Sequence, residues 1–202
     1  MDIFPLLDEL QTLARNGLAF ASDPYDRERY ERLLTLATEG YADLLDAPAE
    51  AIRPRFLQEL GYITPKVGAD AAIFNEDGHI LLMERADGSG WCLPCGWVEP
   101  NEKPSQAVIR EVWEETGLHV EVQRHVGHFT RLPSATNGPH TMIAIVFLCR
   151  VTGGELTLSH EGLALAYWSI DDVQNWHATH ERYARSAWAM WKAGGVGDVV
   201  WD

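Results

Sequence analysis

The chain has 202 residues, of which 46% are hydrophobic and 23% charged, and its formal net charge is −14. This composition is typical of a globular protein, and the length allows one substantial domain with a small second one. The acidity argues against sequence-independent binding to nucleic acid, which relies on clustered Lys and Arg. An anionic substrate is not excluded, but it needs a metal ion or a local basic pocket to offset repulsion.

The sequence also carries information about the compartment of the protein. No apolar run approaches the roughly 20 residues of a membrane span. The acidic, amphipathic start lacks the features of a signal peptide. Three cysteines (Cys92, Cys95 and Cys149) make no even disulfide framework, which fits a reducing compartment. These features predict a cytoplasmic protein.

The first 60 residues have a helical pattern. PLLDELQTLARNGL carries apolar residues at helical spacing and predicts a helix that stops near Asn16-Gly17. A second helix is predicted to start around Ser22-Asp23-Pro24, with Pro in its first turn, and to run to the Pro48 region. Neither helix can bury its apolar face alone, so we expect the two to pack together or against a second copy. A helical N-terminal domain over residues 1–62 is the prediction.

The pattern changes to strands at Lys66, and a second domain is predicted over residues 63–202. GADAAIFNEDGHILLMER predicts two strands around a turn at residues 75–78. WCLPCGWVE is short and extended, and residues 105–116 are predicted to be helical. HVEVQRHVGHFTRL and HTMIAIVFLCRV predict two more strands, joined by the loop PSATNGPH.

The end of the chain continues this alternation. GGELTL and ALAYWSI predict two short strands. Helices are predicted over Asp171–Trp176 and Glu181–Lys192. Strands that alternate irregularly with helices indicate a mixed α/β (α+β) domain.

One predicted helix concentrates negative charge. On a helix with about 100° per residue, Glu111, Glu114 and Glu115 share one face. Apolar residues occupy the opposite arc, which is predicted to face the core: Val108, Ile109, Val112 and Trp113. Ser105 is a plausible start of this helix, and Gly117 a plausible left-handed stop.

Such a cluster of carboxylates needs a reason. Like charges four residues apart cost about 0.2–0.5 kcal/mol per pair in water, and more where solvent is excluded. A solvated acidic face is the simplest interpretation of an arbitrary helix of this kind. A divalent cation offers the direct alternative, because oxygen ligands on adjacent helical turns suit Mg²⁺ or Mn²⁺.

The residues around this helix resemble a known family motif. Gly96, five residues, Glu102, seven residues and then REVWEETGL from Arg110 look like the complete Nudix box of the Nudix hydrolases, with every fixed position filled. The resemblance implies the Nudix fold, a mixed sheet sandwiched between helices. It also implies hydrolysis of a nucleoside diphosphate linked to another moiety, X.

The resemblance also implies roles for the box residues. Glu111 and Glu115 are the expected principal metal ligands, and the carbonyl of Gly96 is a further candidate. Glu114 is expected to be another ligand or the catalytic base. Glu102 and Arg110 are expected to orient the loop and the helix, because an Arg110–Glu114 ion pair would aim the carboxylate. The expected cofactor is Mg²⁺ or Mn²⁺, which neutralises a pyrophosphate and activates water.

Other site residues are candidates outside the box. Glu161 is the candidate for a second catalytic base, because the AYWSIDDV that follows resembles the family segment after that loop. Glu155 is the runner-up, and a solvated loop glutamate is the alternative for Glu161. Arg85 and Arg131 are the candidates for substrate phosphate contacts, although a lone arginine is more often a surface charge.

The segment before the box departs from the family pattern. WCLPCGWVE resembles the common W-x-L-P-G-G, but Cys95 stands where the first glycine is usual, which puts the local loop conformation in question. Cys92-x-x-Cys95 also mimics a redox or zinc motif. With one further cysteine in the chain, four-cysteine zinc ligation is impossible and His partners would be needed. Ordinary strand positions are the favoured interpretation.

The N-terminal part narrows the family. LQTLARNGLAFASDPYDRERYERL and GYITPKVGADAAIF are similar to the helical N-terminal domain of Nudix enzymes of the CDP-choline pyrophosphatase type. This resemblance implies a homodimer through the N-terminal helices and hydrolysis of CDP-choline to CMP and phosphocholine. The alternatives are an ADP-ribose or nucleotide-sugar pyrophosphatase, and a non-catalytic Nudix-fold ligand sensor. The sensor is disfavoured because the box glutamates are intact.

Overall fold

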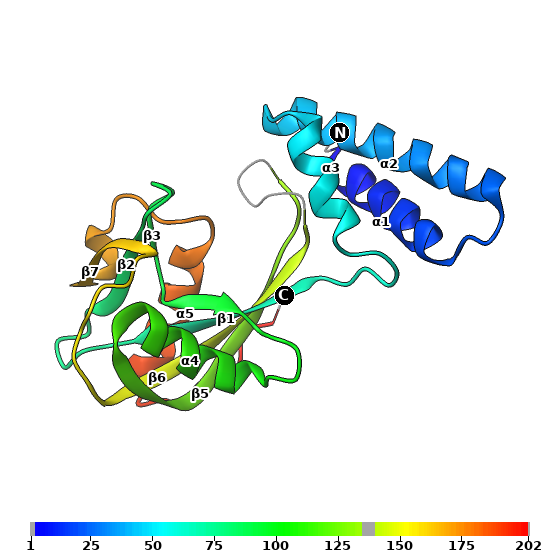
Figure 1. Ribbon diagram of the computed structural model, residues 1–202. Helices are drawn as coiled ribbons and strands as arrows, with labels where there is room; N and C mark the ends of the chain where they lie inside the picture. The colour runs from blue at the N-terminus through cyan, green and yellow to red at the C-terminus, as the bar shows by residue number, and fades with distance from the viewer. Residues whose placement is uncertain (1–2, 135–139, 202) are drawn as a thin grey trace. The chain divides into compact units, whose positions relative to one another are not determined.

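A computed structural model describes residues 3–134 and 140–201 of the chain (Figure 1). Most of the predicted loop PSATNGPH, residues 135–139, lies outside the described residues. Within the described part of the chain, none of the helices combines the length and the apolar character that a membrane span requires.

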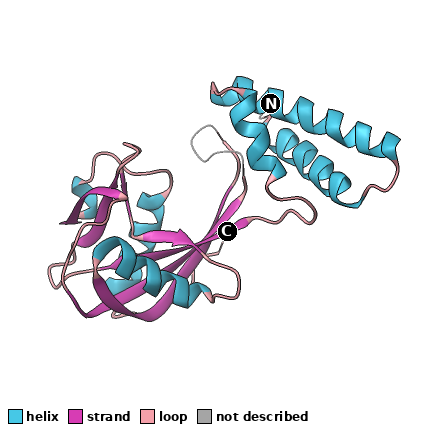
Figure 2. Cartoon of the chain, in the orientation of Figure 1, coloured by secondary structure: helices cyan, strands magenta, loops and turns pink. Residues whose placement is uncertain are grey.

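The chain divides into two compact units. The first consists of Met1–Lys66 together with Arg131–Met142, and the second of Val67–Thr130 together with Ile143–Asp202. The first unit is built mainly of helices, and the second contains strands and helices (Figure 2). The boundary predicted between residues 62 and 63 stays a prediction.

Three helices form most of the first unit. They are α1 (Phe4–Phe20), α2 (Pro24–Leu45) and α3 (Ala49–Leu57). The first two lie side by side (Figure 1). Apolar residues from all three bury a common core that includes Leu7, Leu18, Leu34, Tyr41 and Phe56. Each helix therefore buries its apolar face against the other two, as we expected for α1 and α2.

The helix ends partly match the prediction. Asp23 caps α2 as expected, because its carboxylate accepts a hydrogen bond from the Tyr25 N–H at 2.7 Å. The predicted stop of α1 near Asn16-Gly17 is wrong, since the helix runs on to Phe20. Gly17 is instead a packing residue: a Cβ there would lie 2.3 Å from the Tyr30 ring. The glycine marks a close approach of two helices.

Two sheets form the frame of the second unit. The four-stranded sheet has the order β4-β1-β6-β5. Its strands are β4 (Cys95–Trp97), β1 (Lys66–Ile73), β6 (Met142–Gly154) and β5 (Leu118–Arg131). The three-stranded sheet has the order β3-β2-β7. Its strands are β3 (Trp91–Cys92), β2 (Ile80–Arg85) and β7 (Gly162–Trp168).

Two helices flank the four-stranded sheet. In Figure 1, α4 (Pro104–Thr116) lies in front of this sheet and α5 (His180–Lys192) behind it. The core between α4 and the strands includes Ile73, Leu81, Val108, Val112 and Phe147. The arrangement is the mixed sheet between helices that the sequence predicts.

The chain departs from prediction after β6. GGELTL forms no separate strand, because β6 itself continues to Gly154 and residues 155–159 are irregular. The backbone of this stretch bonds to the end of α4 instead: Thr157 N–H donates to the Thr116 carbonyl at 2.8 Å. The helix predicted at 171–176 is likewise wrong, since only a single 3₁₀ turn, Ile170–Asp172, is present there.

Candidate active site

The carboxylates sit on α4, whose two ends are fixed by local chemistry. The helix begins at Pro104, one residue earlier than predicted, and its cap is Lys103 in place of Ser105. The Gln106 side chain closes the start by accepting the Lys103 N–H at 3.1 Å. At the other end Gly117 takes φ 70°, the left-handed conformation that glycine favours, as predicted.

The buried side of α4 differs from the predicted arc. Val108 and Val112 are buried as expected, but Ile109 and Trp113 are exposed by 39% and 55%. Glu115 takes a core position instead, with 3% of its surface exposed. Part of the acidic face is therefore turned inward, which an ordinary solvated acidic surface would not require.

Glu111 lies directly over Gly96. A Cβ built on Gly96 would fall 2.0 Å from the Glu111 carboxylate carbon, so any side chain there would displace the glutamate. Gly96 belongs to β4, which pairs with β1 through the Ala69–Gly96 register. The strand β4 thereby places the Gly96 backbone against the Glu111 carboxylate. The two candidate metal ligands therefore lie next to each other.

Glu115 is held at the neighbouring residue. The Cys95 N–H donates to Glu115 Oε2 at 2.9 Å. Burial raises the pKa of Glu115 to about 9, and burial also raises the pKa of Glu111. Both shifts show that the folded chain makes negative charge costly at this point.

Arg110 organises the rest of the box. Its guanidinium donates twice to Glu102, both at 2.9 Å, and once to the Trp97 carbonyl at 3.0 Å. It also donates to Glu111 at 2.7 Å and to Glu114 at 3.0 Å. These bonds, Glu102 first, raise the pKa of Arg110. Arg110 thereby links Glu102, which precedes α4, to two glutamates of the helix.

Glu161 lies on the loop that covers the end of α4. Ser159 N–H donates to the Glu115 carbonyl at 3.3 Å, and the Glu161 N–H donates to Ser159 Oγ at 3.3 Å. The charge of Glu161 contributes to the raised pKa values of both Glu111 and Glu115. A cleft of about 540 Å³ has Glu114, Glu161 and Trp113 in its wall. The structure therefore brings Glu161 to the box glutamates.

The two candidate arginines differ in position. Arg85 is the last residue of β2 and is the ladder partner of Gly162, which follows Glu161. Its hydrogen bond to Asp87 is the largest cause that raises its pKa, and the nearby Cys92 and Cys95 raise it further. Arg131 belongs to the first unit, where its guanidinium contacts the Met142 sulfur. Of these two, Arg85 belongs to the unit that contains the box, and its guanidinium is paired with Asp87 at 2.9 Å.

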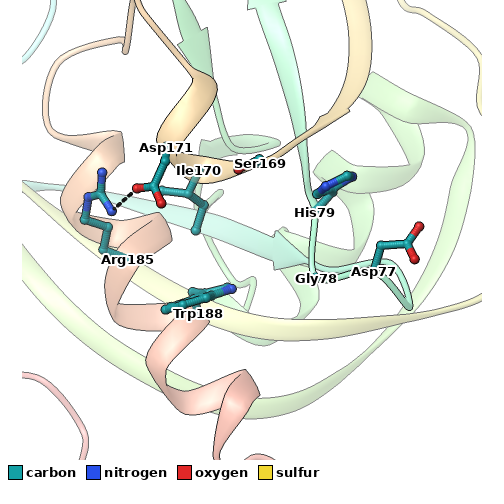
Figure 3. A pocket seen from close by; sticks show the side chains of 8 residues that line it. All are labelled: Asp77, Gly78, His79, Ser169, Ile170, Asp171, Arg185 and Trp188. Carbon is teal, nitrogen blue, oxygen red and sulfur yellow. Dashed lines mark hydrogen bonds and ion pairs between the residues drawn. The ribbon is translucent and has the colours of Figure 1, made fainter.

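A separate pocket lies beside the β1–β2 turn. Figure 3 shows this cavity of about 180 Å³, which Gly78 and His79 line from the turn and Trp188 from α5. Its arginine, Arg185, is paired with Asp171 at 2.9 Å. The pocket contains none of the box residues, so we do not assign the reaction to it.

The residues fit a divalent cation. Arg110 pairs with Glu102, Glu111 and Glu114, but in the described structure it does not pair with Glu115. Glu115 is thus a buried carboxylate whose donor is a neutral backbone N–H. A hard cation that takes oxygen ligands would compensate Glu111 and Glu115 together.

The structure corrects the prediction for Trp113 and agrees with the favoured interpretation of Cys95. The exposed Trp113 was predicted to be core, although one turn of helix separates it from Ile109, which is also exposed. Cys95 was a conformational question, but it is absent from the described non-glycine residues with positive φ and pairs regularly with Asp70 in β1. Its side chain therefore fits an ordinary strand position.

Two family models match the chain. The model of the NUDIX domain matches residues 64–188, and the model described as "UDP-X-like, N-terminal oligomerisation domain" matches residues 1–56. The chain belongs to the Nudix hydrolase family. It is a Nudix pyrophosphohydrolase, an enzyme that acts on phosphoric anhydrides of the nucleoside diphosphate–X kind.

Individual relatives agree with this family. The chain is 32% identical over 136 residues to the ADP-ribose pyrophosphatase of Methanocaldococcus jannaschii, which covers 66% of this chain and 78% of the relative. A crystal structure of UDP-X diphosphatase matches 100% of this chain and 98% of its own, with 25% identity and a TM-score of 0.61. An ADP-ribose pyrophosphatase structure from Streptococcus suis matches 68% of this chain and 98% of its own, with 31% identity and a TM-score of 0.56.

Proposed function

We propose that this Nudix enzyme hydrolyses a nucleoside diphosphate linked to a small moiety X, with Mg²⁺ or Mn²⁺ held by Glu111 and Glu115. The observation that carries the proposal is the buried Glu115 carboxylate, one turn of helix from a Glu111 carboxylate that packs against Gly96. Carboxylate oxygens on adjacent turns suit these hard cations. The carbonyl of Gly96 and the Glu114 carboxylate complete the proposed ligand set.

The chain's own residues have distinct tasks in the reaction. A bound cation neutralises charge on the pyrophosphate and lowers the pKa of water. Glu114 or Glu161, which share one cleft wall, accepts the proton of the attacking water. Arg110 and Glu102 hold the helix and the loop in register. Arg85 supplies positive charge for the substrate phosphates.

Three groups of substrate are candidates. CDP-choline is the first to test, because the helical N-terminal segment resembles that type of Nudix enzyme. UDP-linked substrates are favoured by the match to UDP-X diphosphatase along the whole chain. ADP-ribose is the third candidate, because a relative and a solved structure, each over 30% identical to this chain, are named for it.

We also propose that the N-terminal helices join two copies of the chain into a homodimer. The matching family model describes an oligomerisation domain. Leu6, Leu13 and Phe20 follow each other at seven-residue spacing on α1 and are exposed by 52%, 51% and 62%. Residues seven positions apart lie on the same face of a helix, so these three apolar side chains point in one direction.

The substrate proposal is tested by phosphate release in the presence of a coupling phosphatase. The purified chain is given Mg²⁺ or Mn²⁺ with CDP-choline, UDP-glucose, ADP-ribose, diadenosine polyphosphates or nucleoside triphosphates. A clear preference for CDP-choline supports the N-terminal resemblance. A preference for ADP-ribose keeps the mechanism and replaces the substrate. No turnover of any compound would favour the ligand sensor.

A further inference from the structure

Three side chains of types that bind metals lie close together, and they are not the glutamates of the box. Asp70, Cys95 and His180 each offer a ligand atom, and all these atoms lie within 4.8 Å of one another. Asp70 and His180 are 2% and 3% exposed. The three residues come from β1, β4 and the first turn of α5. The fold, and not a sequence motif, brings them together.

The distances suit one tetrahedral ion. His180 Nδ1 lies 3.6 Å from Asp70 Oδ1. Two ligand atoms that are each about 2.0–2.1 Å from a tetrahedral zinc ion lie roughly 3.4 Å apart. Asp70 and Cys95 are direct partners in the β1–β4 ladder, so their side chains share one face of the sheet. Only small shifts separate this arrangement from coordination.

The histidine nitrogen faces the carboxylate across a short gap. His180 Nδ1 accepts the Leu93 N–H at 3.2 Å, and a metal bound at Nδ1 would take the place of this hydrogen bond. Imidazole nitrogen, carboxylate oxygen and thiolate sulfur together are a ligand set that zinc takes.

Cys92 is the candidate for a fourth ligand. It is fully buried in β3, three positions before Cys95, and its thiol donates to the Met83 carbonyl at 3.5 Å and lies within hydrogen-bonding reach of the Cys95 thiol. A Cys-x-x-Cys pair commonly supplies two of the four ligands of a zinc site. The sequence alone does not show which histidine could join this pair. His180 and Asp70 provide the other half.

The geometry points to a structural zinc site formed by Cys92, Cys95, Asp70 and His180, separate from the oxygen-ligand site of the Nudix box. Thiolate, imidazole and carboxylate ligands select Zn²⁺ over Mg²⁺. The ion would join α5 to β1 and β4. Because the Cys95 N–H bonds to Glu115 and Gly96 follows directly, it would also fix the strand on which the box carboxylates close.

Cobalt is the probe that tests this site. The full chain is stripped with a chelator and titrated with Co²⁺ in excess Mg²⁺, which occupies the oxygen-ligand site. We expect one Co²⁺ per chain with a thiolate-to-cobalt absorption band, and loss of this band when one equivalent of Zn²⁺ is added. Zn²⁺ should also raise the melting temperature of the stripped protein.

Two variants and two controls make the test specific. Cys95→Gly introduces the residue that the family pattern carries, and it should lower Co²⁺ affinity by about 100-fold or more and remove the band. His180→Asn should do the same, and serves if Cys95→Gly does not fold. Cys149→Ala, which removes a buried thiol on β6, and Glu111→Gln should keep the band. Absence of a thiolate band in the parent chain, or its persistence in Cys95→Gly and His180→Asn, would overturn the proposal.

Discussion

At the scale of single residues, the site depends on close approaches that leave no room for additional atoms. Gly96 and Glu111 are the clearest case, because the glycine has no Cβ where the carboxylate lies. Arg110 then holds three glutamates through hydrogen bonds of 2.7–3.0 Å. Catalysis is sensitive to such positions, since a shift of about 1 Å can cost 100-fold in rate.

Gly96→Ala tests this close approach. The new methyl group would displace Glu111, and we expect turnover to fall by about 100-fold while the fold is retained. Steady-state kinetics and circular dichroism measure the two effects. Gly153→Ala is the matched control, because a Cβ there meets no atom within 4 Å. Equal turnover in both variants would remove Gly96 from the site.

Trp113 is expected to contribute to substrate binding. Its ring is 55% exposed and lines the cleft with Glu114 and Glu161. Stacking on a base, or a cation–π contact with a quaternary ammonium group, is worth about 1–3 kcal/mol. Trp113→Ala should therefore raise KM by about 10-fold with little change in kcat. Trp188→Ala, in the separate pocket of Figure 3, should leave KM unchanged.

At the scale of elements, much of the architecture could be predicted from local pattern. The β1–β2 turn, the cap at Asp23, the stop at Gly117 and the helix α5 all follow from residues within a few positions of each other. The carboxylate cluster could be predicted too, because helical spacing brings Glu111 and Glu115 together.

The errors share a physical cause, which is contact with distant parts of the chain. GGELTL has strand propensity, but its backbone bonds to the end of α4. Gly17 suggests a helix end, but it admits the Tyr30 ring. Trp113 was assigned to the core from its position on a helical wheel. The wheel does not show that the buried side of α4 includes Glu115 and excludes Trp113. Local pattern does not contain these tertiary contacts.

Gly17→Ala tests the packing of α1 on α2. Alanine is the better helix former by about 1 kcal/mol, but its methyl group would lie 2.3 Å from Tyr30. Overpacking of this kind typically costs 1–3 kcal/mol, so we expect a net loss of stability of about 1 kcal/mol. Calorimetry measures it, with Asn16→Ala as the control on the same helix. In a chain that already carries Tyr30→Ala, Gly17→Ala should no longer lower the stability. If Gly17→Ala costs the same with and without Tyr30, the contact is contradicted.

At the scale of the whole molecule, two units combine different kinds of surface. The second unit contains the candidate active site, and the helices of the first unit expose large apolar residues. The full-length match to UDP-X diphosphatase shows that this combination of a helical segment and a Nudix domain occurs in a solved structure. The proposed homodimer accounts for the exposed stripe on α1.

Leu6→Glu combined with Leu13→Glu tests the dimer. Charges at two of the three stripe positions should convert the dimer to a monomer, because unpaired charges are costly in an apolar interface. Light scattering coupled to size-exclusion chromatography gives the mass. Val196→Glu, at a position that is 70% exposed in the second unit, is the control and should keep the dimer. An unchanged mass in the double variant would exclude this face as the interface.

The central claim is that Glu111 and Glu115 hold the divalent cation that hydrolysis needs. The direct measurement is Mn²⁺ binding, followed by electron paramagnetic resonance, together with turnover of the preferred substrate in the parent chain and in Glu115→Gln. We predict that Glu115→Gln folds normally, binds Mn²⁺ more weakly and loses more than about 100-fold in kcat. Near-normal Mn²⁺ affinity and kcat in this variant would contradict the assignment of the metal site.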